Sequence, residues 1–562
     1  MLAPATPNAF TLSDELLETL CELRPVSATL YGVPGHDHLW DDFSPAGAER
    51  VATALRDLEQ RAAALPPPAT ADERLAKVVL DEVLSTELAR LAEGDHLSDL
   101  NSIASPLQNL RLVFDAMGKS SRDGWRDVAE RLHGLERACA GYREALDEGL
   151  RTGRAVARRQ VLAAIREARV HAAEGSYFAS LPRDFAAART DDPALLARLV
   201  SGAEAARRAY GALADWLEQT YLPRASSGDA VGRERYLRLA RRFLGIDIDP
   251  VETFAWGLEE VRSIGARMRE VALEVAPGAS VAEALALLKS DPARSAPNAA
   301  AFVEIMAARQ AHALADLAGR HFDVPEPVRR IEVRLAPKGG ALGAYYLPPS
   351  EDWSRPGTVW YQPGDDHPIP LYGEVSTAYH EGFPGHHLQC GIQVSLRGKL
   401  SRLHRVAVES YLGFVEGWAL YAERLMEELG YYEKPDYVLG MLSQQMMRAC
   451  RVALDIGAHL ELELPASSPF RPGARVDYEH GVAMLTEVAG LPLDQAESEM
   501  TRYLGWPGQA IAYKVGERAI LELREEVRRR DGAAFDLRAF HARLLGNGAV
   551  GLATMRELVL AG

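Results

Sequence analysis

Residues 371–389 read LYGEVSTAYHEGFPGHHLQ, and nowhere else in the chain do a carboxylate and three histidines lie so close together. In a zinc-binding H-E-x-x-H helix, two histidines one turn apart bind the ion, and the intervening glutamate acts as general base. Here His380-Glu381 is separated from His386-His387 by a Gly-Phe-Pro-Gly insert. The stretch therefore predicts a metal site on an interrupted helix, with Glu381 as the general base. The alternative is a solvated, turn-forming segment that binds no metal.

The insert decides which histidine can be the second ligand. On an undistorted helix, six residues rotate His386 about 120° away from His380, off the face that one ion could contact. Pro384 removes a backbone donor and the flanking glycines relax the backbone, so a bend can return His386 to the ion. On a regular helix His387 lies within about 20° of His380, but about 10.5 Å farther along the axis. We expect His386 to bind the metal and His387 to contact substrate, and the reverse assignment stays open.

A third ligand has to come from another element. Residues 409–428, ESYLGFVEGWALYAERLMEE, have the apolar spacing of a helix, and Glu416 interrupts its apolar stripe. Glu423 lies seven residues later on the same face and is the next candidate. A glutamate paired with a buried arginine is the alternative interpretation of Glu416. We expect one zinc ion per chain, bound by His380, His386 and Glu416.

Four stretches, YHEGFPGHHLQ, FVEGWALYAE, RACRVALDIGAH and PGQAIAYKVG, occur in this order and carry a resemblance. They resemble the bacterial family catalogued as domain of unknown function 885, over most of the chain. That family is thought to be similar to gluzincin metallopeptidases such as angiotensin-converting enzyme, thimet oligopeptidase and the Taq carboxypeptidase. The resemblance implies a largely helical, zincin-like fold with a cleft. The chain departs from the gluzincin pattern because two extra residues separate its histidines.

The resemblance also implies roles for residues farther along the chain. In gluzincins, a tyrosine far downstream of the glutamate ligand donates to the developing oxyanion, and basic or tyrosyl neighbours hold the substrate carboxylate. Tyr513, which follows a turn at residues 505–508, is compatible with that tyrosine, and a core tyrosine is the alternative. We expect Lys514, Gln509 and Tyr345 to contact substrate.

One more histidine has the spacing of a catalytic assistant. Asp455 and His459 lie at i, i+4 on one face of a helix expected over residues 441–463. Such a pair suits a residue that orients a ligand or donates to a transition state. We expect His459 to assist Tyr513, and a buried histidine with satisfied hydrogen bonds is the alternative.

The pattern of apolar residues divides the chain into two expected lobes. Residues 1–290 have helical spacing throughout, and residues 291–562 contain the metal-site motifs. Between residues 331 and 362 the period changes to alternation, in IEVRL, AYYL and TVWYQ, which predicts a small antiparallel sheet beside the metal-site helix. An extended peptide could add to an exposed edge of that sheet, and Gly339, Gly340 and Gly343 would permit close approach. A plain hairpin packed on helices is the alternative.

Charge and composition exclude several classes of partner. With 63 basic and 79 acidic residues the formal charge is −16, so the chain has no global attraction for nucleic acids or anionic membranes. The first twenty residues lack the basic start and apolar core of a signal peptide, and no apolar run could span a bilayer. Four widely spaced cysteines form no C-x-x-C pair, which is typical of reduced, buried thiols. We expect a cytoplasmic protein.

These observations together predict a mainly α-helical, two-lobed, zincin-like protein with a minor sheet. Its expected activity is hydrolysis of short peptides by zinc-activated water with a glutamate base. A metal-dependent amidase or esterase with a non-peptide substrate is the second interpretation. A non-enzymatic helical scaffold with a degenerate metal site is the third. Peptide preference, the end that is cleaved and the oligomeric state are left open by the sequence.

Overall fold

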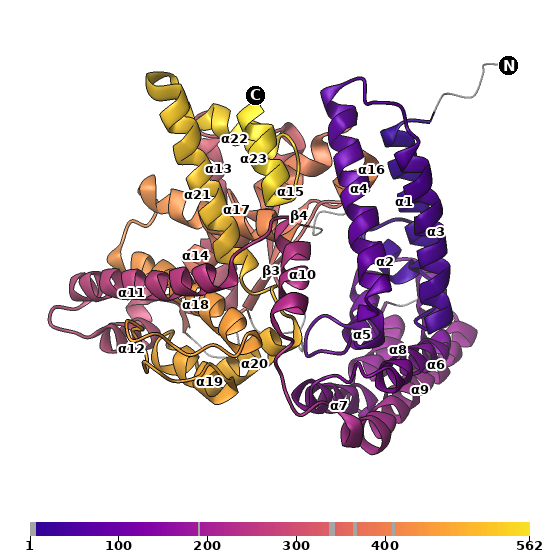
Figure 1. Cartoon of the computed structure of the whole chain (residues 1–562). Helices are drawn as coiled ribbons and strands as arrows, with labels where there is room; N and C mark the ends of the chain where they lie inside the picture. Colours follow the sequence, from indigo (N-terminus) through magenta and orange to yellow (C-terminus); the bar gives the residue numbers. More distant parts are fainter. Residues whose placement is uncertain (1–6, 189–190, 337–342, 364–367, 407–410, 562) are drawn as a thin grey trace. The chain divides into compact units, whose positions relative to one another are not determined.

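The computed structural model describes residues 7–188, 191–336, 343–363, 368–406 and 411–561. It is mainly helical with a small sheet, as predicted (Figure 1). The chain forms two compact units, one of residues Met1–Asp229 with Ser401–Leu403, and one of Ala230–Leu400 with His404–Gly562. The predicted boundary at residue 290 is therefore wrong. The reason is that α11 (Pro250–Val275) packs along α18 (Pro435–His459), which commits residues 230–290 to the second unit.

The first unit consists of helices. Capping residues set where several of them begin, because side-chain oxygens accept from otherwise unpaired first-turn N–H groups. Ser44 accepts from Gly47 N at 3.1 Å, and Asp192 accepts from Leu195 N at 3.0 Å. The helices are α1 (Ala9–Leu23), α2 (Pro25–Leu30), α3 (Pro45–Ala63), α4 (Ala71–Ala92), α5 (Pro106–Ala116), α6 (Arg122–Arg151), α7 (Arg158–Ala172), α8 (Tyr177–Ala187) and α9 (Pro193–Trp216), with short turns at Asp95–Leu97, Leu217–Tyr221 and Leu222–Arg224.

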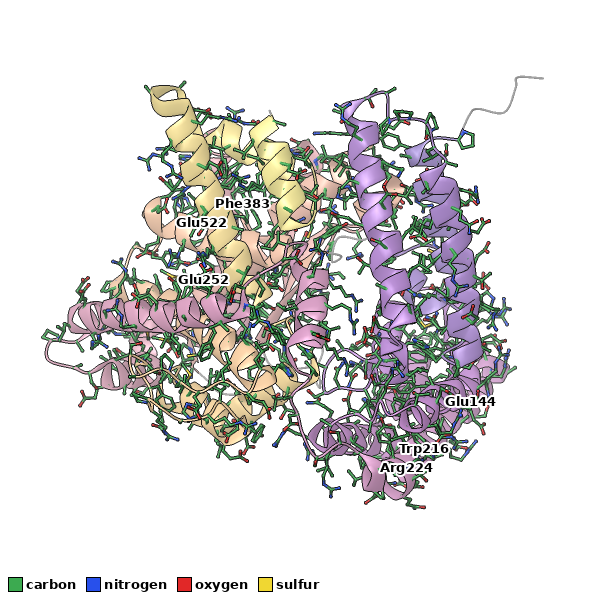
Figure 2. The ribbon with its side chains drawn as sticks, in the orientation of Figure 1. Glu144, Trp216, Arg224, Glu252, Phe383 and Glu522 are labelled. Carbon is green, nitrogen blue, oxygen red and sulfur yellow. The ribbon has the colours of Figure 1, made fainter. Side chains whose placement is uncertain are left out.

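The core of the first unit is aromatic. The helices α1, α3 and α4 pack together, and α6 lies beside α9 (Figure 1). Phe114 and Phe178 meet edge to face with ring centroids 5.7 Å apart, and Tyr210 lies 5.5 Å from Phe178. Figure 2 labels Glu144, which lies on the exposed face of α6. The amphipathic spacing thus sorts each helix into a packed and a solvated face.

The second unit contains the remaining helices. They are α10 (Arg233–Leu244), α11, α12 (Val281–Ser290), α13 (Ala299–Leu317), α14 (Glu374–Glu381), α15 (His386–Ser395), α17 (Leu412–Glu428), α18, α19 (Tyr478–Glu487), α20 (Leu493–Gly505), α21 (Ala512–Asp531), α22 (Leu537–Leu545) and α23 (Leu552–Ala561), with short turns at Pro292–Arg294, Glu326–Arg329 and Gly532–Ala534. The short α16 (Arg402–Val406) contains residues of both units. Within the described residues, no helix is both long and apolar enough to cross a membrane.

The two helices α17 and α21 lie side by side in the second unit (Figure 1). Glycines face each other where they touch, because a Cβ at Gly417 would overlap backbone atoms of Gly516. The absence of both side chains lets the helix backbones come into direct contact. This contact matters for the site because Gly417 follows Glu416, and Gly516 lies one turn after Tyr513.

The sheet has three strands, β2 (Ile331–Leu335), β3 (Gly343–Leu347) and β4 (Gly357–Gln362), in the order β2-β4-β3. The predicted strand positions are confirmed, but the prediction of a purely antiparallel sheet is wrong, since β2 pairs with β4 in parallel. The reason lies in β4, which is mostly buried and takes the central place between the other two. A pair of short strands, β1 (Ser295–Ala296) and β5 (Ile369–Pro370), forms a second ladder. Gly339 and Gly340 lie outside the described residues.

The sheet lies against α14, as predicted. Tyr361 of β4 belongs to one apolar cluster with Ala378 of α14 and with Phe302 of α13. The ring of Tyr361 meets that of Phe302 edge to face, with centroids 5.2 Å apart. The face of α14 that carries Ala378 is therefore turned toward β4.

Candidate metal centre

The histidine-rich stretch forms two helices instead of one bent helix. The helix α14 ends at Glu381 and α15 begins at His386, so residues 382–385 are a connection between separate axes. A Cβ at position 385 would overlap the carbonyl oxygen of His380, and only glycine fits there. The close approach brings the start of α15 back to the end of α14. The predicted distortion by Pro384 and its glycines thus takes the form of a complete break.

Two buried side chains hold this connection in place. Gln310 of α13 accepts from Phe383 N at 2.6 Å and donates to the carbonyl oxygen of Ala378. Trp418 of α17 donates its indole N–H to the carbonyl oxygen of Pro384 at 2.9 Å. Phe383, labelled in Figure 2, is fully buried. Because the backbone groups of the break are paired, the geometry between the two histidine helices is fixed.

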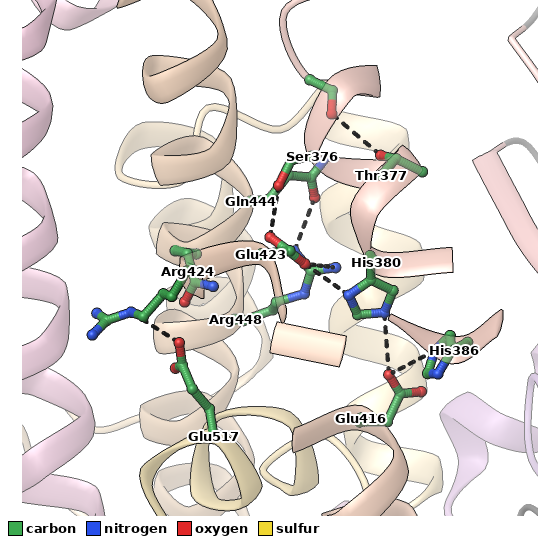
Figure 3. Close-up of polar contacts among 12 residues, drawn as sticks. Ser376, Thr377, His380, His386, Glu416, Glu423, Arg424, Gln444, Arg448 and Glu517 are labelled. Atoms are coloured by element: carbon green, nitrogen blue, oxygen red, sulfur yellow. Dashed lines mark hydrogen bonds and ion pairs between the residues drawn. The ribbon is translucent and has the colours of Figure 1, made fainter. Parts of the chain in front are cut away.

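The break brings His380, His386 and Glu416 into one cluster (Figure 3). The Nε2 atom of His380 lies 3.3 Å from Glu416 Oε2, and the Nε2 atom of His386 lies 3.6 Å from the same oxygen. The two imidazoles are nearly perpendicular, with ring centroids 4.8 Å apart. One ligand atom from each of the three residues lies within 4.8 Å of the others. Three metal-ligand side chains from three helices therefore converge on one point.

The chemistry of this donor set fits zinc. Zinc bonds of about 2.0–2.2 Å at tetrahedral angles separate neighbouring ligand atoms by about 3.4 Å. The distances from Glu416 Oε2 to the two imidazole nitrogens, 3.3 and 3.6 Å, agree with that separation. Two histidines and one glutamate also match the protein ligands of catalytic zinc sites that keep a fourth position open. In addition, His386 Nδ1 is buried and has no hydrogen-bond partner among the residues that the structure describes.

A second carboxylate orients the first histidine. Glu423, fully buried on α17, lies 2.7 Å from His380 Nδ1 (Figure 3). Ser376 donates to the other oxygen of Glu423 at 2.7 Å, and Tyr432 donates to Ser376 at 3.2 Å. Arg448 of α18 lies 3.5 Å from the Glu423 carboxylate. A carboxylate on the distal nitrogen fixes the ring and the tautomer of a metal-binding histidine.

The electrostatics of the cluster favour a bound cation. Burial alone would lower the pKa of His380, whereas its hydrogen bonds to Glu416 and Glu423 raise that pKa to about 9. Burial alone would raise the pKa of Glu416, whereas hydrogen bonds to His380 and His386 bring it well below its ordinary value. The carboxylates therefore hold positive charge on the imidazole. A metal ion would replace that proton, because a histidine ligand must be deprotonated.

Glu381 adjoins the cluster without belonging to it. Burial raises the pKa of its carboxyl, and the nearby His380 and His386 oppose this effect. Across the described residues, no hydrogen bond or ion pair engages the carboxylate. A carboxylate with a raised pKa, close to the ligands but unpaired, has the properties of a general base.

Tyr513 is brought to the same place by the contact between α17 and α21. Burial raises the pKa of its hydroxyl, and the charge of Glu416 raises it further. Arg451 lies over the tyrosine ring, 4.8 Å from the centroid, and Arg502 lies 3.5 Å from the hydroxyl oxygen. The arginines orient the phenol beside the cluster.

His387 has contacts of its own, away from the other two histidines. It is fully buried, with Nε2 at 2.7 Å from the carbonyl oxygen of Val328 and Nδ1 at 3.1 Å from the Tyr346 hydroxyl. Both ring nitrogens are thus occupied by protein atoms. The expectation that His387 contacts substrate does not fit these contacts, and neither does its alternative assignment as a metal ligand.

The expected substrate contacts also have protein partners. Lys514 is buried and lies 2.8 Å from Glu260 and 2.5 Å from Glu517. Gln509 accepts from Arg502 at 2.8 Å. Tyr345, about half exposed on β3, stacks on Trp360 with ring centroids 6.3 Å apart. The structure does not bring these three residues to the metal-ligand cluster, because ion pairs and sheet packing place them elsewhere.

His459 is also placed in a separate network. It is fully buried, and its Nε2 lies 3.0 Å from the carbonyl oxygen of Tyr503. Its neighbour Asp455 accepts from Tyr236 at 3.1 Å and from Gly508 N at 3.0 Å. The contacts of His459 tie α18 to α20 and do not reach Tyr513, so the structure supports the alternative of a buried core histidine.

Several residues of the site were not predicted from the sequence, or were predicted with a lesser role. Glu423 was only a substitute ligand, although its spacing of two turns from Glu416 indicates a shared face. Ser376 lies one turn before His380, and that spacing is a usable signal. Arg448 is part of the RACRVALDIGAH stretch. Gln310 had no signal, because its role depends on how α13 packs in three dimensions.

Comparisons with known proteins agree with this fold over nearly the whole chain. The chain is similar to a structure from Colwellia psychrerythraea described as a putative lipoprotein, with 23% identity, a TM-score of 0.85 and 98% of each chain covered. It is also similar to a structure from Shewanella oneidensis described as a putative lipoprotein of unknown function. The sequence identity is 17%, the TM-score is 0.75, and the match covers 99% of this chain and 100% of that chain. At these identities the likeness concerns the fold alone. No curated protein matches the chain significantly.

The sequence itself matches a family model over residues 25–559. The matched span covers most of both compact units and includes His380, His386 and Glu416. The chain therefore belongs to the family described as bacterial protein of unknown function, DUF885.

Proposed function

We propose that this chain is a zinc-dependent hydrolase that cleaves short peptides, with a zincin-like arrangement of its helices. The observation that carries the proposal is the convergence of His380, His386 and Glu416 beside the unpaired carboxylate of Glu381. Ligand atoms from three helices, spaced as tetrahedral zinc ligands are spaced, imply a site built for an ion. An adjacent carboxylate that binds no metal implies proton transfer in addition to structural binding.

Each residue of the site has its own role in the proposed hydrolysis. When bound, zinc supplies Lewis acidity that polarises a carbonyl group and acidifies water. Glu381 takes the proton from the attacking water and passes it to the leaving amine. Tyr513 donates its hydroxyl hydrogen to the oxygen that becomes negative, an interaction worth roughly 3–4 kcal/mol for one well-placed donor. Glu423 keeps the Nε2 atom of His380 directed at the ion.

Peptides are the proposed substrates because of the sheet beside α14. The strands β2 and β3 are the edges of the three-stranded sheet, and an extended backbone can pair with such an edge. A metal-dependent amidase or esterase would use the same cluster with a non-peptide substrate. A helical scaffold with a degenerate metal site would have no use for an unpaired glutamate next to the ligands.

The cellular compartment is part of the proposal. We expect a cytoplasmic protein from the sequence, whereas the two similar structures come from proteins described as putative lipoproteins. We propose the cytoplasm for this chain. Fractionation of cells that express the natural gene decides between the cytoplasm and a membrane-associated fraction.

The test combines metal analysis with a substrate panel. Purified protein should contain about one zinc ion per chain and cleave peptides of a few residues. Glu381→Gln should abolish cleavage and keep the zinc, because Glu381 transfers protons and binds no metal. Glu427→Gln, a change at a partly buried position of α17 that pairs with Arg267, is the matched control and should retain both. Zinc with cleavage of esters or simple amides but no peptide would favour the amidase or esterase. Protein that neither binds zinc nor cleaves any substrate would refute the proposal.

A further inference from the structure

A second carboxylate of α14 is placed to recognise substrate. Glu374 and Glu381 are seven residues apart at the two ends of this helix, so they lie on one face about 10.5 Å apart along the axis. Ala378, which lies between them on that face, belongs to the same buried apolar cluster as Tyr361 of β4. Glu374 is therefore turned toward the sheet, on the same side as the proposed general base.

Glu374 has no counter-charge among the residues that the structure describes. Its side chain is partly buried, and burial alone raises the pKa of its carboxyl to about 7. Among the residues that the structure describes, no lysine, arginine or histidine pairs with it, and no donor hydrogen-bonds it. Partly buried carboxylates are normally paired or hydrogen-bonded, since an unpaired buried charge is costly. A cation or a strong donor would pair with this carboxylate.

The charge of this carboxylate acts on two tyrosines. The charge of Glu374 adds to burial in raising the pKa of Tyr372 to about 12, and burial and the same charge raise the pKa of Tyr361 well above its ordinary value. Tyr361 is 1% exposed, and its hydroxyl has no hydrogen-bond partner among the described residues. Buried phenols normally hydrogen-bond. A carboxylate without a described partner, whose charge acts on two tyrosines, has the composition of a site for an ammonium or guanidinium group.

We propose that Glu374, with Tyr361 and Tyr372, binds a positively charged group of the substrate about 10 Å from the bond that is cleaved. The inference rests on the proposed peptidase function and deepens it. An extended peptide spans about 3.3–3.6 Å per residue, so that distance corresponds to about three residues. The charged group is an N-terminal ammonium, or the side chain of a lysine or arginine nearer to the bond.

A structural role for Glu374 is the competing explanation. It occupies the first turn of α14, where a carboxylate stabilises the helix N-terminus. That role affects the melting temperature and is insensitive to the charge of a bound peptide. The two explanations therefore differ in how Glu374→Gln changes the binding of charged and neutral peptides.

The experiment measures peptide binding separately from cleavage. Zinc-loaded Glu381→Gln protein, which the mechanism makes inactive, is titrated by calorimetry with tetra-alanine, with N-acetyl-tetra-alanine and with N-acetyl-lysyl-trialanine. The same titrations are repeated after adding Glu374→Gln, or Glu522→Gln as an exposed control on α21 (Figure 2). We expect Glu374→Gln to weaken tetra-alanine at least about tenfold, as for a lost hydrogen bond between charged groups, and to leave N-acetyl-tetra-alanine unchanged.

The results of these titrations test the Glu374 inference separately from the proposed function. If N-acetyl-lysyl-trialanine binds as tightly as tetra-alanine, the site accepts a basic side chain, and if it binds as weakly as the acetylated control, the site requires the N-terminal ammonium. Either result supports the inference. Equal effects of Glu374→Gln on charged and neutral peptides, no effect on either, or no binding by any of the three peptides would overturn it. Whether the unaltered protein cleaves peptides is recorded separately and bears only on the proposed function.

Discussion

His380 contacts a carboxylate through each ring nitrogen, with Glu423 at 2.7 Å from Nδ1 and Glu416 at 3.3 Å from Nε2. Both glutamates lie on α17, two turns apart. One helix therefore supplies a proposed metal ligand and also the carboxylate that orients His380, a second proposed ligand. The imidazole cannot rotate without breaking the Glu423 contact, which is itself held by Ser376.

Glu423→Gln should weaken zinc binding by 10–100-fold, the range found when the partner of a ligating histidine is lost. An amide can still accept from Nδ1, but it no longer polarises the imidazole. Competition with a fluorescent chelator measures the affinity, with Glu427→Gln on the same helix as control. Unchanged affinity in Glu423→Gln would show that the Nδ1 contact has no influence on the metal.

His386→Ala should lose zinc, and His387→Ala should keep it. The reason is that His386 points at Glu416, whereas both nitrogens of His387 are engaged by Val328 and Tyr346. Metal content by mass spectrometry distinguishes the variants, and circular dichroism melting completes the comparison. His387→Ala should have a melting temperature clearly below that of the parent, since it leaves a buried carbonyl unpaired. The reverse pattern of metal loss would exchange the two roles.

Tyr513→Phe should lower kcat and kcat/KM about equally, by roughly 100-fold or more, while KM and zinc content stay unchanged. This pattern is expected if the hydroxyl binds only the transition state. The arginine contacts to the ring survive in phenylalanine, so the variant tests the hydroxyl alone. A change confined to KM would make Tyr513 a contact of the bound substrate in its ground state.

Acid should destabilise the fold through buried neutral histidines. Burial lowers the pKa of His404 to about 4 against the opposing hydrogen bond to the Ala549 carbonyl oxygen, while the unfolded value is about 6.5. The unfolded chain therefore binds more protons between these values. The stabilisation is complete above pH 6.5 and declines as pH falls toward 4, by at most about 3 kcal/mol for this residue.

Replacing that histidine tests the effect. His404→Gln keeps an N–H donor for the Ala549 carbonyl oxygen but does not titrate, so it should reduce the loss of stability on acidification. Denaturant titrations of both proteins at pH 7, 6 and 5 measure the free energy of unfolding. Parallel pH dependences in parent and variant would exclude His404 as a contributor.

The local part of this structure was predictable. The strands of the sheet and the long helices follow their hydrophobic periods, and Pro384 with its glycines indicated the interruption after His380. The sequence also selected His380, His386 and Glu416, the three residues that the structure brings together. Each of these inferences depends on spacing along the chain, which a single sequence contains.

The non-local part was not predictable. The parallel pairing of β2 with β4 joins strands that are not consecutive, so no turn between them fixes the register. Lys514 looked available for substrate because its partner Glu260 comes from α11, far away in the sequence, although Glu517 lies one turn later on the same helix. Gln310, which holds the break between the two histidine helices, lies far from them in sequence.

The glycine contact between α17 and α21 affects which substitutions can move these two helices relative to each other. Helix separations are usually set by side chains, and exchange of a core residue then shifts one helix relative to its neighbour. Here the backbones of Gly417 and Gly516 are in direct contact, so no side chain separates the segment that carries Glu416 from the segment that carries Tyr513. The distance between the Glu416 carboxylate and the Tyr513 phenol is therefore set by the backbone. Surrounding apolar residues can diverge freely while that distance persists.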